Sequence, residues 1–204
     1  SSRHSFWKTE GPAAWHRETF FGDVALTWKP QGGRLQASME VFAHCNGPDA
    51  NSGYSLKLES AEEVVLRRKG KEVGRKRDPE ALAKASSMTL RCVQGALAVL
   101  ADDQELLTFR DPEPIARGRL GAARGTGWVN AEELSVFARN LHDDPFRQAP
   151  VDWEIDTGDW GVQSRWACTP RWSWFGGRSP MAATIWHRDR FRGDFTVDLV
   201  ASFR

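Results

Sequence analysis

The feature that most constrains this chain is a nine-residue block that occurs twice. Residues 15–23 are Trp-His-Arg-Glu-Thr-Phe-Phe-Gly-Asp, and residues 186–194, at an offset of 171, are Trp-His-Arg-Asp-Arg-Phe-Arg-Gly-Asp. A block that recurs without an internal gap indicates that the chain contains parts of two copies of one structural unit. A repeat must be identified first, because overlooking it leads to a wrong fold assignment. Because the block occurs in both copies, we interpret His16 and His187 as structural residues and Gly-Asp as the turn before the next strand.

The pattern of apolar residues predicts a mainly β-stranded chain. Alternation with a period of two, bounded by Gly, Pro, Asn and Asp, is typical of strands. It occurs over residues 23–29, 35–42, 53–58, 64–66, 88–93, 96–100, 105–109, 118–122, 128–130 and 134–138. One short helix is expected over 79–86, because Asp78 can cap its N-terminus and Pro79 suits its first position.

Composition argues against several functional classes. The chain has 28 basic and 27 acidic residues and a net charge of +1, so its overall charge does not favour nucleic acid as a partner. Its apolar runs fall short of the roughly 18 residues that a membrane helix needs, so we expect no membrane span. Cys45, Cys92 and Cys168 lack Cys-x-x-Cys spacing, which argues against that kind of zinc site. One disulfide with a free thiol, or three thiols, remain open.

The order of the predicted strands resembles concanavalin A-like jelly-roll domains, a superfamily that includes laminin-G-like and 3-keto-disaccharide hydrolase-like domains. A hairpin strand, a Gly-x-Leu-Gly strand and a Leu-x-Val-Phe strand carry the resemblance to the closing third, at residues 106–109, 118–121 and 134–137. The opening pattern of such domains occurs late in this chain, at Trp153, residues 158–162 and residues 165–166. The resemblance implies an all-β antiparallel jelly-roll sandwich and an extracellular or cell-surface location.

This order suggests a circular shift. Residues 1–145 resemble a jelly roll without its first strands, and residues 147–204 resemble those strands without the remainder. Because the termini of this fold lie close together, such a shift costs little. We expect one β-sandwich over residues 1–204, closed by 147–204. The alternative is a structural or assembly domain, part of a tandem protein, whose exposed sheet edges require self-association or another chain.

A cluster of tryptophans provides the leading candidate for a binding site. Its members are Trp153, Trp160, Trp166, Trp172 and Trp174. Exposed indoles offer a large, flat and rigid surface for a sugar ring, although the same side chains could form a core or a partner interface. The leading hypothesis is therefore a non-catalytic carbohydrate-binding or adhesion module with an aromatic-lined face.

Three carboxylates in the same region suggest an alternative, a glycoside hydrolase. Laminarinase-type glucanases of the fold that this chain resembles carry Glu-x-Asp-x-x-Glu, and Glu154 and Asp156 match its first two acids. Positions two apart on a strand share a face. This arrangement would place Glu154 and Asp156 together, as a nucleophilic carboxylate and the carboxylate that assists it require. Asp159 stands where the family has Glu, and Thr157-Gly158 interrupts the strand before it. The alternative is that residues 153–160 have no catalytic role and form a strand with a turn at Thr157-Gly158.

Two further segments suggest weaker binding sites. A basic cluster offers a candidate polyanion site, formed by Arg67, Arg68, Lys69, Lys71, Arg75, Lys76 and Arg77. Its glycines equally predict a solvated hairpin tip whose charges protect a sheet edge. The polar loop 46–53 offers oxygen ligands for calcium, but its single carboxylate, Asp49, favours an ordinary loop. No other cofactor is expected.

Overall fold

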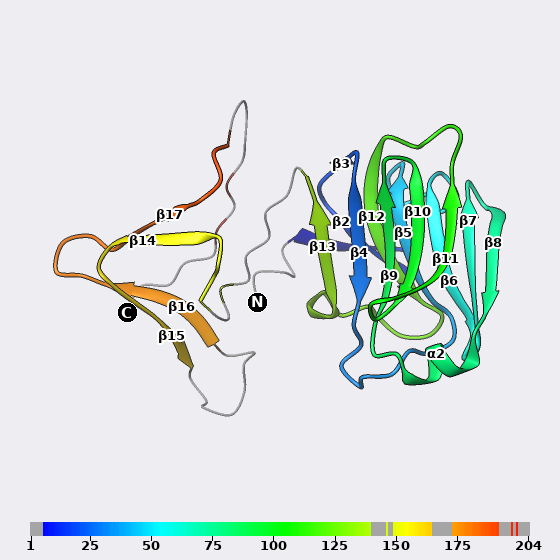
Figure 1. Ribbon diagram of the computed structural model, residues 1–204, viewed down its shortest axis with the longest axis horizontal. Helices are drawn as coiled ribbons and strands as arrows, with labels where there is room; N and C mark the ends of the chain where they lie inside the picture. The colour runs from blue at the N-terminus through cyan, green and yellow to red at the C-terminus, as the bar shows by residue number, and fades with distance from the viewer. Residues whose placement is uncertain are drawn as a thin grey trace. The chain divides into compact units, whose positions relative to one another are not determined.

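The chain folds into two compact units, residues 3–143 and residues 144–204. The computed structural model describes residues 6–139, 146, 149–164, 173–191, 197 and 199. In Figure 1 the first unit runs from blue to green, and the strands of the second are yellow to orange.

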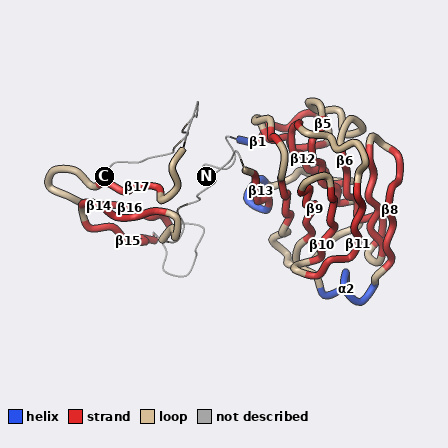
Figure 2. Tube along the Cα trace, turned by 45° about the horizontal axis from the view of Figure 1, so that its top comes forward, coloured by secondary structure: helices blue, strands red, loops and turns tan. Residues whose placement is uncertain are grey.

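The first unit is an antiparallel sandwich of two sheets. The eight-stranded sheet contains, in spatial order, β1 (Trp7–Glu10), β2 (Ala13–His16), β12 (Arg117–Arg124), β5 (Met39–Cys45), β6 (Tyr54–Ser60), β7 (Glu63–Arg68) and β8 (Lys71–Arg77), with β3 (Phe20–Phe21) also paired to β12. The five-stranded sheet contains β11 (Gln104–Arg110), β10 (Ala96–Ala101), β9 (Met88–Val93), β4 (Val24–Trp28) and β13 (Leu134–Ala138). Figures 1 and 2 show the sheets as two layers. The all-β jelly-roll prediction is confirmed.

Strand alternation builds the core between the two layers. Val24, Leu26 and Trp28 alternate along β4 and are all buried, and Leu56 and Leu66 of the larger sheet are also fully buried. Burying one such aliphatic side chain contributes about 1.5–3 kcal/mol. The period-two pattern of the sequence therefore marks the faces that pack against each other.

The predicted helix is present as α2 (Pro79–Lys84). The Asp78 carboxylate accepts a hydrogen bond from the Ala81 amide at 3.0 Å, which satisfies a donor that the first turn would otherwise leave unpaired. Ala85 adopts an extended conformation and ends the helix. The described helices include none that is both apolar and long enough to cross a bilayer.

Two of the predicted strands differ from the observed ones. The strand predicted over 35–42 begins only at Met39, because Ser38 has a φ of 68° and its amide donates to the Leu58 carbonyl at 2.7 Å. Residues 128–130 form no strand. They precede the 3₁₀ helix η1 (Ala131–Glu133), whose Glu132 amide donates to the Asn130 side chain at 3.0 Å.

The second unit contains two antiparallel strand pairs. β14 (Trp153–Thr157) pairs with β17 (Thr184–His187), and β15 (Asp159–Ser164) pairs with β16 (Ser173–Arg178). Among the described strands, these four pair only with one another.

The first unit already contains strands in the place that we assigned to residues 147–204. β1, β2 and β3 supply them, and residues 6–139 form both sheets. The sequence pattern did not reveal β2 because Ala13–His16 is buried at all four positions and so lacks alternation. The described strand pairing thus contains no sandwich closed by 147–204, and the circularly shifted order over 1–204 has no support in it.

Candidate functional site

The strand pair β15–β16 presents a face with one indole and a bare backbone surface beside it. Three cross-strand pairs share this face: Asp159 with Arg178, Gly161 with Gly176, and Gln163 with Trp174. A Cβ added to Gly161 would meet nothing within 4 Å, and one added to Gly176 would lie 3.4 Å from the Trp174 ring. The Arg178 guanidinium donates to the Gln163 side-chain carbonyl at 3.4 Å. We call this surface, formed by these six residues, the indole–glycine face.

The opposite face of the same strand pair is occupied by ring packing. Trp160 stacks on Phe175 with centroids 5.3 Å apart, and Phe175 in turn stacks on Phe146 at 6.3 Å. The Trp160 indole N–H donates to the Thr157 carbonyl at 2.8 Å. Trp160 is therefore held by contacts within the unit.

Trp153 also packs within the second unit. Its ring meets the edge of the His187 ring at 5.1 Å and lies 5.4 Å from the Phe146 ring. Of the five tryptophans proposed from the sequence, Trp153 and Trp160 belong to this ring packing and Trp174 lies on the indole–glycine face. Trp166 and Trp172 lie outside the described residues.

The three candidate carboxylates lie on two different strand pairs. Glu154 is exposed on β14 opposite Trp186, whereas Asp159 begins β15. The register of β14 shifts between Ile155 and Thr157, and the Asp156 carboxylate accepts a hydrogen bond from the Thr184 hydroxyl at 2.9 Å. The bulge interrupts the alternation on which the pairing of Glu154 with Asp156 was predicted.

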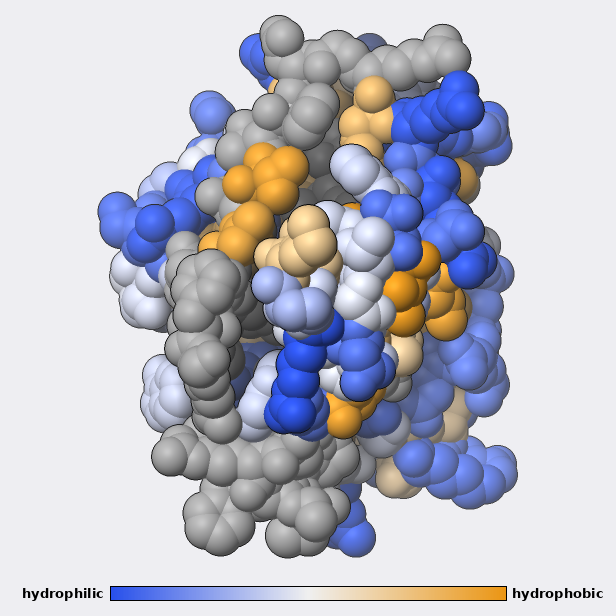
Figure 3. Space-filling view, turned by 90° about the vertical axis from the view of Figure 1, so that its left-hand side faces the viewer, coloured by the Kyte–Doolittle hydropathy of each residue, from blue (hydrophilic) through white to orange (hydrophobic). Residues whose placement is uncertain are grey.

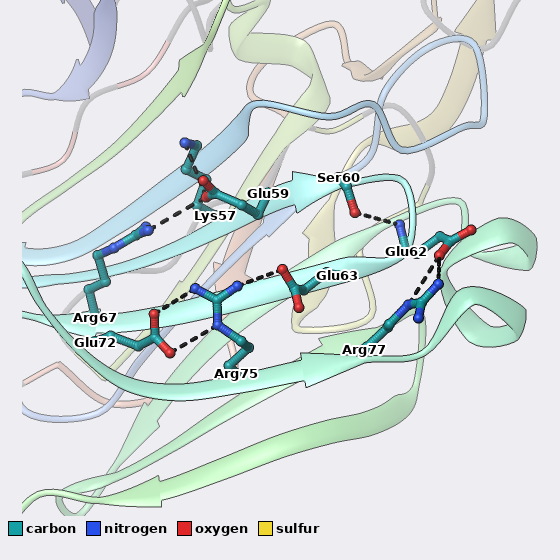
Figure 4. A network of polar contacts seen from close by, with 9 residues as sticks. All are labelled: Lys57, Glu59, Ser60, Glu62, Glu63, Arg67, Glu72, Arg75 and Arg77. Carbon is teal, nitrogen blue, oxygen red and sulfur yellow. Dashed lines mark hydrogen bonds and ion pairs between the residues drawn. The ribbon is translucent and has the colours of Figure 1, made fainter.

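The basic cluster lies on the β7–β8 hairpin, where much of its charge is compensated. The Arg75 guanidinium contacts Glu63 at 2.6 Å and Glu72 at 2.7 Å, and Arg67 contacts Glu59 at 3.5 Å. Figure 4 shows these pairs along the strands, together with the ion pair between Arg77 and Glu62.

Arg68 points elsewhere, to the buried carboxylate of Asp111. The remaining cations of the cluster, Lys69, Lys71 and Lys76, make no ion pair within the described part of the chain. The hairpin thus presents alternating charges rather than a uniformly positive surface, as cross-strand pairing of opposite charges favours.

The polar loop that suggested calcium is closed by its own hydrogen bonds. The Asp49 carboxylate accepts from the Asn51 amide at 3.0 Å, and the Ser52 hydroxyl donates to the Asp49 carbonyl at 2.6 Å. Within the described ranges, no group of three or more His, Cys, Asp or Glu side chains is arranged to hold a metal ion.

Two of the three cysteines are buried free thiols. They are Cys45 and Cys92, and burial raises the pKa of both thiols to about 12. Cys168 lies outside the described residues. Thiols in this state are poor nucleophiles at neutral pH.

One surface feature of the first unit has no signal in the sequence pattern. An open hollow of about 410 Å³ lies on the five-stranded sheet, lined by Arg91, Val93, Ala96, Leu97, Ala98, Glu105 and Thr108. Arg91 and Glu105 form an ion pair at 3.3 Å across it. These residues come from three strands, so only the sheet register brings them together.

Comparison with known proteins finds matches among solved structures. No protein-family model matches it. No curated protein matches it either. The carbohydrate-binding module CBM66 from Bacillus subtilis resembles it with a TM-score of 0.42 and 12% identity, over 57% of this chain and 81% of that chain.

Two other solved structures resemble the chain to a similar degree. One is a Bacillus subtilis protein of unknown function with a galectin-like fold, with a TM-score of 0.42, 16% identity, and coverage of 54% of this chain and 69% of that chain. The other is a prokaryotic β-1,3-1,4-glucanase (lichenase) derived from a mouse hindgut metagenome. Its TM-score is 0.38 and its identity 15%, with coverage of 56% of this chain and 59% of that chain. These TM-scores are all below 0.5, so the comparisons add no argument to the sequence resemblance, and a fold reused so widely does not decide function.

Proposed function

We propose that this chain is a non-catalytic carbohydrate-binding module whose ligand lies on the indole–glycine face of β15–β16. The observation that carries the proposal is the position of Trp174 beside Gly161 and Gly176. Glycines leave the backbone bare next to the indole, so a flat ring can approach both surfaces at once. An indole supplies large apolar contact at a low cost in side-chain entropy.

The polar groups around this indole suit a sugar. Hydroxyl groups both donate and accept hydrogen bonds, and the Gln163 amide can do both as well. The planar Arg178 guanidinium adds donors in a fixed geometry, and the Asp159 carboxylate adds acceptors. Donors and acceptors around one apolar surface are the usual composition of a small-molecule site.

The backbone beneath the face supports its rigidity. β15 and β16 are paired over six consecutive residues, from Asp159 with Arg178 to Ser164 with Ser173. On the opposite side, Trp160 fills the space over Gly177, where an added Cβ would lie 2.4 Å from the Trp160 ring. A binding site on a supported strand pair loses less conformational freedom on binding than a site on a loop.

Titration calorimetry against neutral, uronic-acid-containing and sulfated oligosaccharides tests the proposal. The full chain is expected to bind at least one of these classes, and Trp174→Ala is expected to weaken the Kd by about tenfold or more. Trp128→Ala is the matched control, because Trp128 is 72% exposed on the first unit. Its binding should equal that of the parent chain.

Two results would overturn the proposal. One is the absence of binding across the three oligosaccharide classes, and the other is an unchanged Kd for Trp174→Ala. A reducing-end assay on each ligand that binds tests the non-catalytic part, because sustained release of new ends would instead support hydrolysis by Glu154 and Asp156.

A further inference from the structure

Two segments far apart in the sequence have the same local geometry. In the first unit Trp7 pairs with His16 across β1 and β2, and the two rings meet edge to face at 5.1 Å and 83°. In the second unit Trp153 pairs with His187 across β14 and β17, again at 5.1 Å and 83°. In each copy the tryptophan that begins the repeated block, Trp15 or Trp186, immediately precedes this histidine.

The hydrogen bonds around each histidine also correspond. The Glu18 amide donates to His16 Nδ1 at 3.1 Å, and the Asp189 amide donates to His187 Nδ1 at 3.0 Å. The amide that follows each histidine, that of Arg17 or of Arg188, donates at 2.8 Å to the carbonyl of the residue preceding the first tryptophan. A shared set of backbone and ring contacts indicates the same structural unit rather than a chance match of letters.

The strand pair β15–β16 explains why the sequence did not show the full correspondence. Eight positions separate Trp7 from Trp15, whereas 33 separate Trp153 from Trp186, so the second copy has 25 additional residues. These residues contain β15 and β16, which follow β14 and precede β17. β14 and β17 therefore correspond to β1 and β2, and the proposed ligand face is carried by an insertion between them.

In the first unit a neighbouring strand covers the Trp15 indole. β12 pairs with β2 so that Gly121 lies opposite Trp15, and a Cβ added to Gly121 would lie 2.5 Å from the indole ring. On β5, the strand beyond, Phe42 stacks on the indole at 5.2 Å. Trp15 is consequently only 1% exposed.

In the second unit the corresponding indole is at the surface. Trp186 is 64% exposed, and β17 pairs only with β14 among the described strands. Further exposed apolar side chains of this unit are Ile155, Val162 and Met181. Figure 3 shows apolar side chains, in orange, among polar ones on the surface that faces the viewer.

We propose that the side of β17 opposite β14 binds an antiparallel β-strand from a partner polypeptide, with a glycine opposite Trp186 and small side chains beside it. The partner strand has the chemistry of β12, where Gly121 is followed by Ala122 and Ala123. Strand addition supplies main-chain hydrogen bonds for affinity, and the glycine requirement under the indole supplies specificity. By this correspondence β14 and β17 match the opening strands β1 and β2 of the first unit.

A synthetic peptide with the sequence of residues 117–125 (RGRLGAARG) serves as the partner probe for the full chain. Hydrogen exchange followed by mass spectrometry reports on the amides of residues 184–187. Saturating peptide is expected to slow their exchange by about tenfold, because strand pairing protects amides from solvent. The same peptide with Gly121→Leu is the matched control and should give no protection, since its side chain would occupy the space of the indole.

A Trp186→Ala chain separates this surface from other binding. Trp186 is largely exposed, so its removal should leave the chain folded while abolishing the protection. The proposal is overturned if the glycine peptide gives no protection at the limit of its solubility, if the leucine peptide protects equally, or if Trp186→Ala retains the effect. Trp174→Ala should retain it, because β15–β16 is a separate strand pair, so this result does not depend on the proposed sugar site.

Discussion

His16 shows how one buried side chain links the stability of the first unit to pH. Burial, and secondarily the charge of Arg119, lower the pKa of His16 to about 4, from 6.5 in an exposed position. Its ring packs against Trp7 and Phe20, and its Nδ1 accepts a hydrogen bond that protonation would break. This packing agrees with a structural role for the repeated block.

The expected pH dependence follows from the lowered pKa of His16. As the pH falls, the unfolded chain binds a proton near pH 6.5 and the folded chain only near pH 4, so the free energy of unfolding decreases between these values by roughly 3 kcal/mol. His16→Gln should be less stable than the parent chain at pH 7. Because it lacks the His16 proton, its free energy of unfolding should decrease less between pH 7 and pH 4.5. Urea denaturation at pH 7 and pH 4.5 measures both chains, and an identical difference between the two pH values would contradict the assignment.

Gly121 is a residue at which steric fit is tight on the outer side of the larger sheet, because an added Cβ would lie 2.5 Å from the Trp15 ring. Gly121→Ala would place a methyl group against the Trp15 ring, so we expect a loss of about 2 kcal/mol in the free energy of unfolding. Gly32→Ala is the control, because a Cβ there meets nothing within 4 Å. Urea denaturation should separate the two variants clearly, and equal stabilities would show that Trp15 can move aside.

At the scale of elements, one buried carboxylate joins the larger sheet to the loop after β11. Asp111 is 3% exposed and accepts hydrogen bonds from the Tyr54 hydroxyl at 2.6 Å and from Arg68. Asp111→Ala removes the partner of both groups, so we expect a loss of roughly 3 kcal/mol in unfolding free energy. Arg77→Gln, which removes an exposed ion pair with Glu62, should cost far less, because solvent screens that pair.

Asp111→Ala and Arg77→Gln together test whether burial decides how much an ion pair of the β7–β8 hairpin contributes to the free energy of unfolding. Arg77 and Glu62 have side chains that are 70% and 48% exposed, whereas the Asp111 side chain is fully buried. Chemical denaturation of both variants gives the comparison. A loss for Arg77→Gln as large as that for Asp111→Ala would contradict this account.

Most strands of the first unit could be predicted from the sequence because one face of each is buried and the other is exposed. β4 and β9 alternate clearly and were predicted nearly to their ends. β2 and β8 were missed for opposite reasons, since β2 is buried throughout and β8 has no buried residue. Alternation is informative only where a strand separates core from solvent.

For the whole molecule, the division into two units predicts independent folding of the first. Its hydrophobic core lies between Trp7 and Ala138, and both sheets close without the second unit. A fragment of residues 1–139 should therefore unfold cooperatively, at the same urea midpoint as the main transition of the full chain. Circular dichroism measures both, and a fragment without a cooperative transition would show that the second unit is needed for the fold.

The sequence by itself determined the strand-rich composition, the jelly-roll class, the position of α2 and the existence of a duplicated block. These features depend on local periodicity, capping and turn chemistry, which neighbouring residues specify. Only the tertiary structure decided that β1–β3 complete the first sandwich, that Trp15 is covered while Trp186 is exposed, and that Trp174 shares a face with two glycines. Those outcomes depend on strand register and on which strand lies alongside, and residues distant in sequence set both.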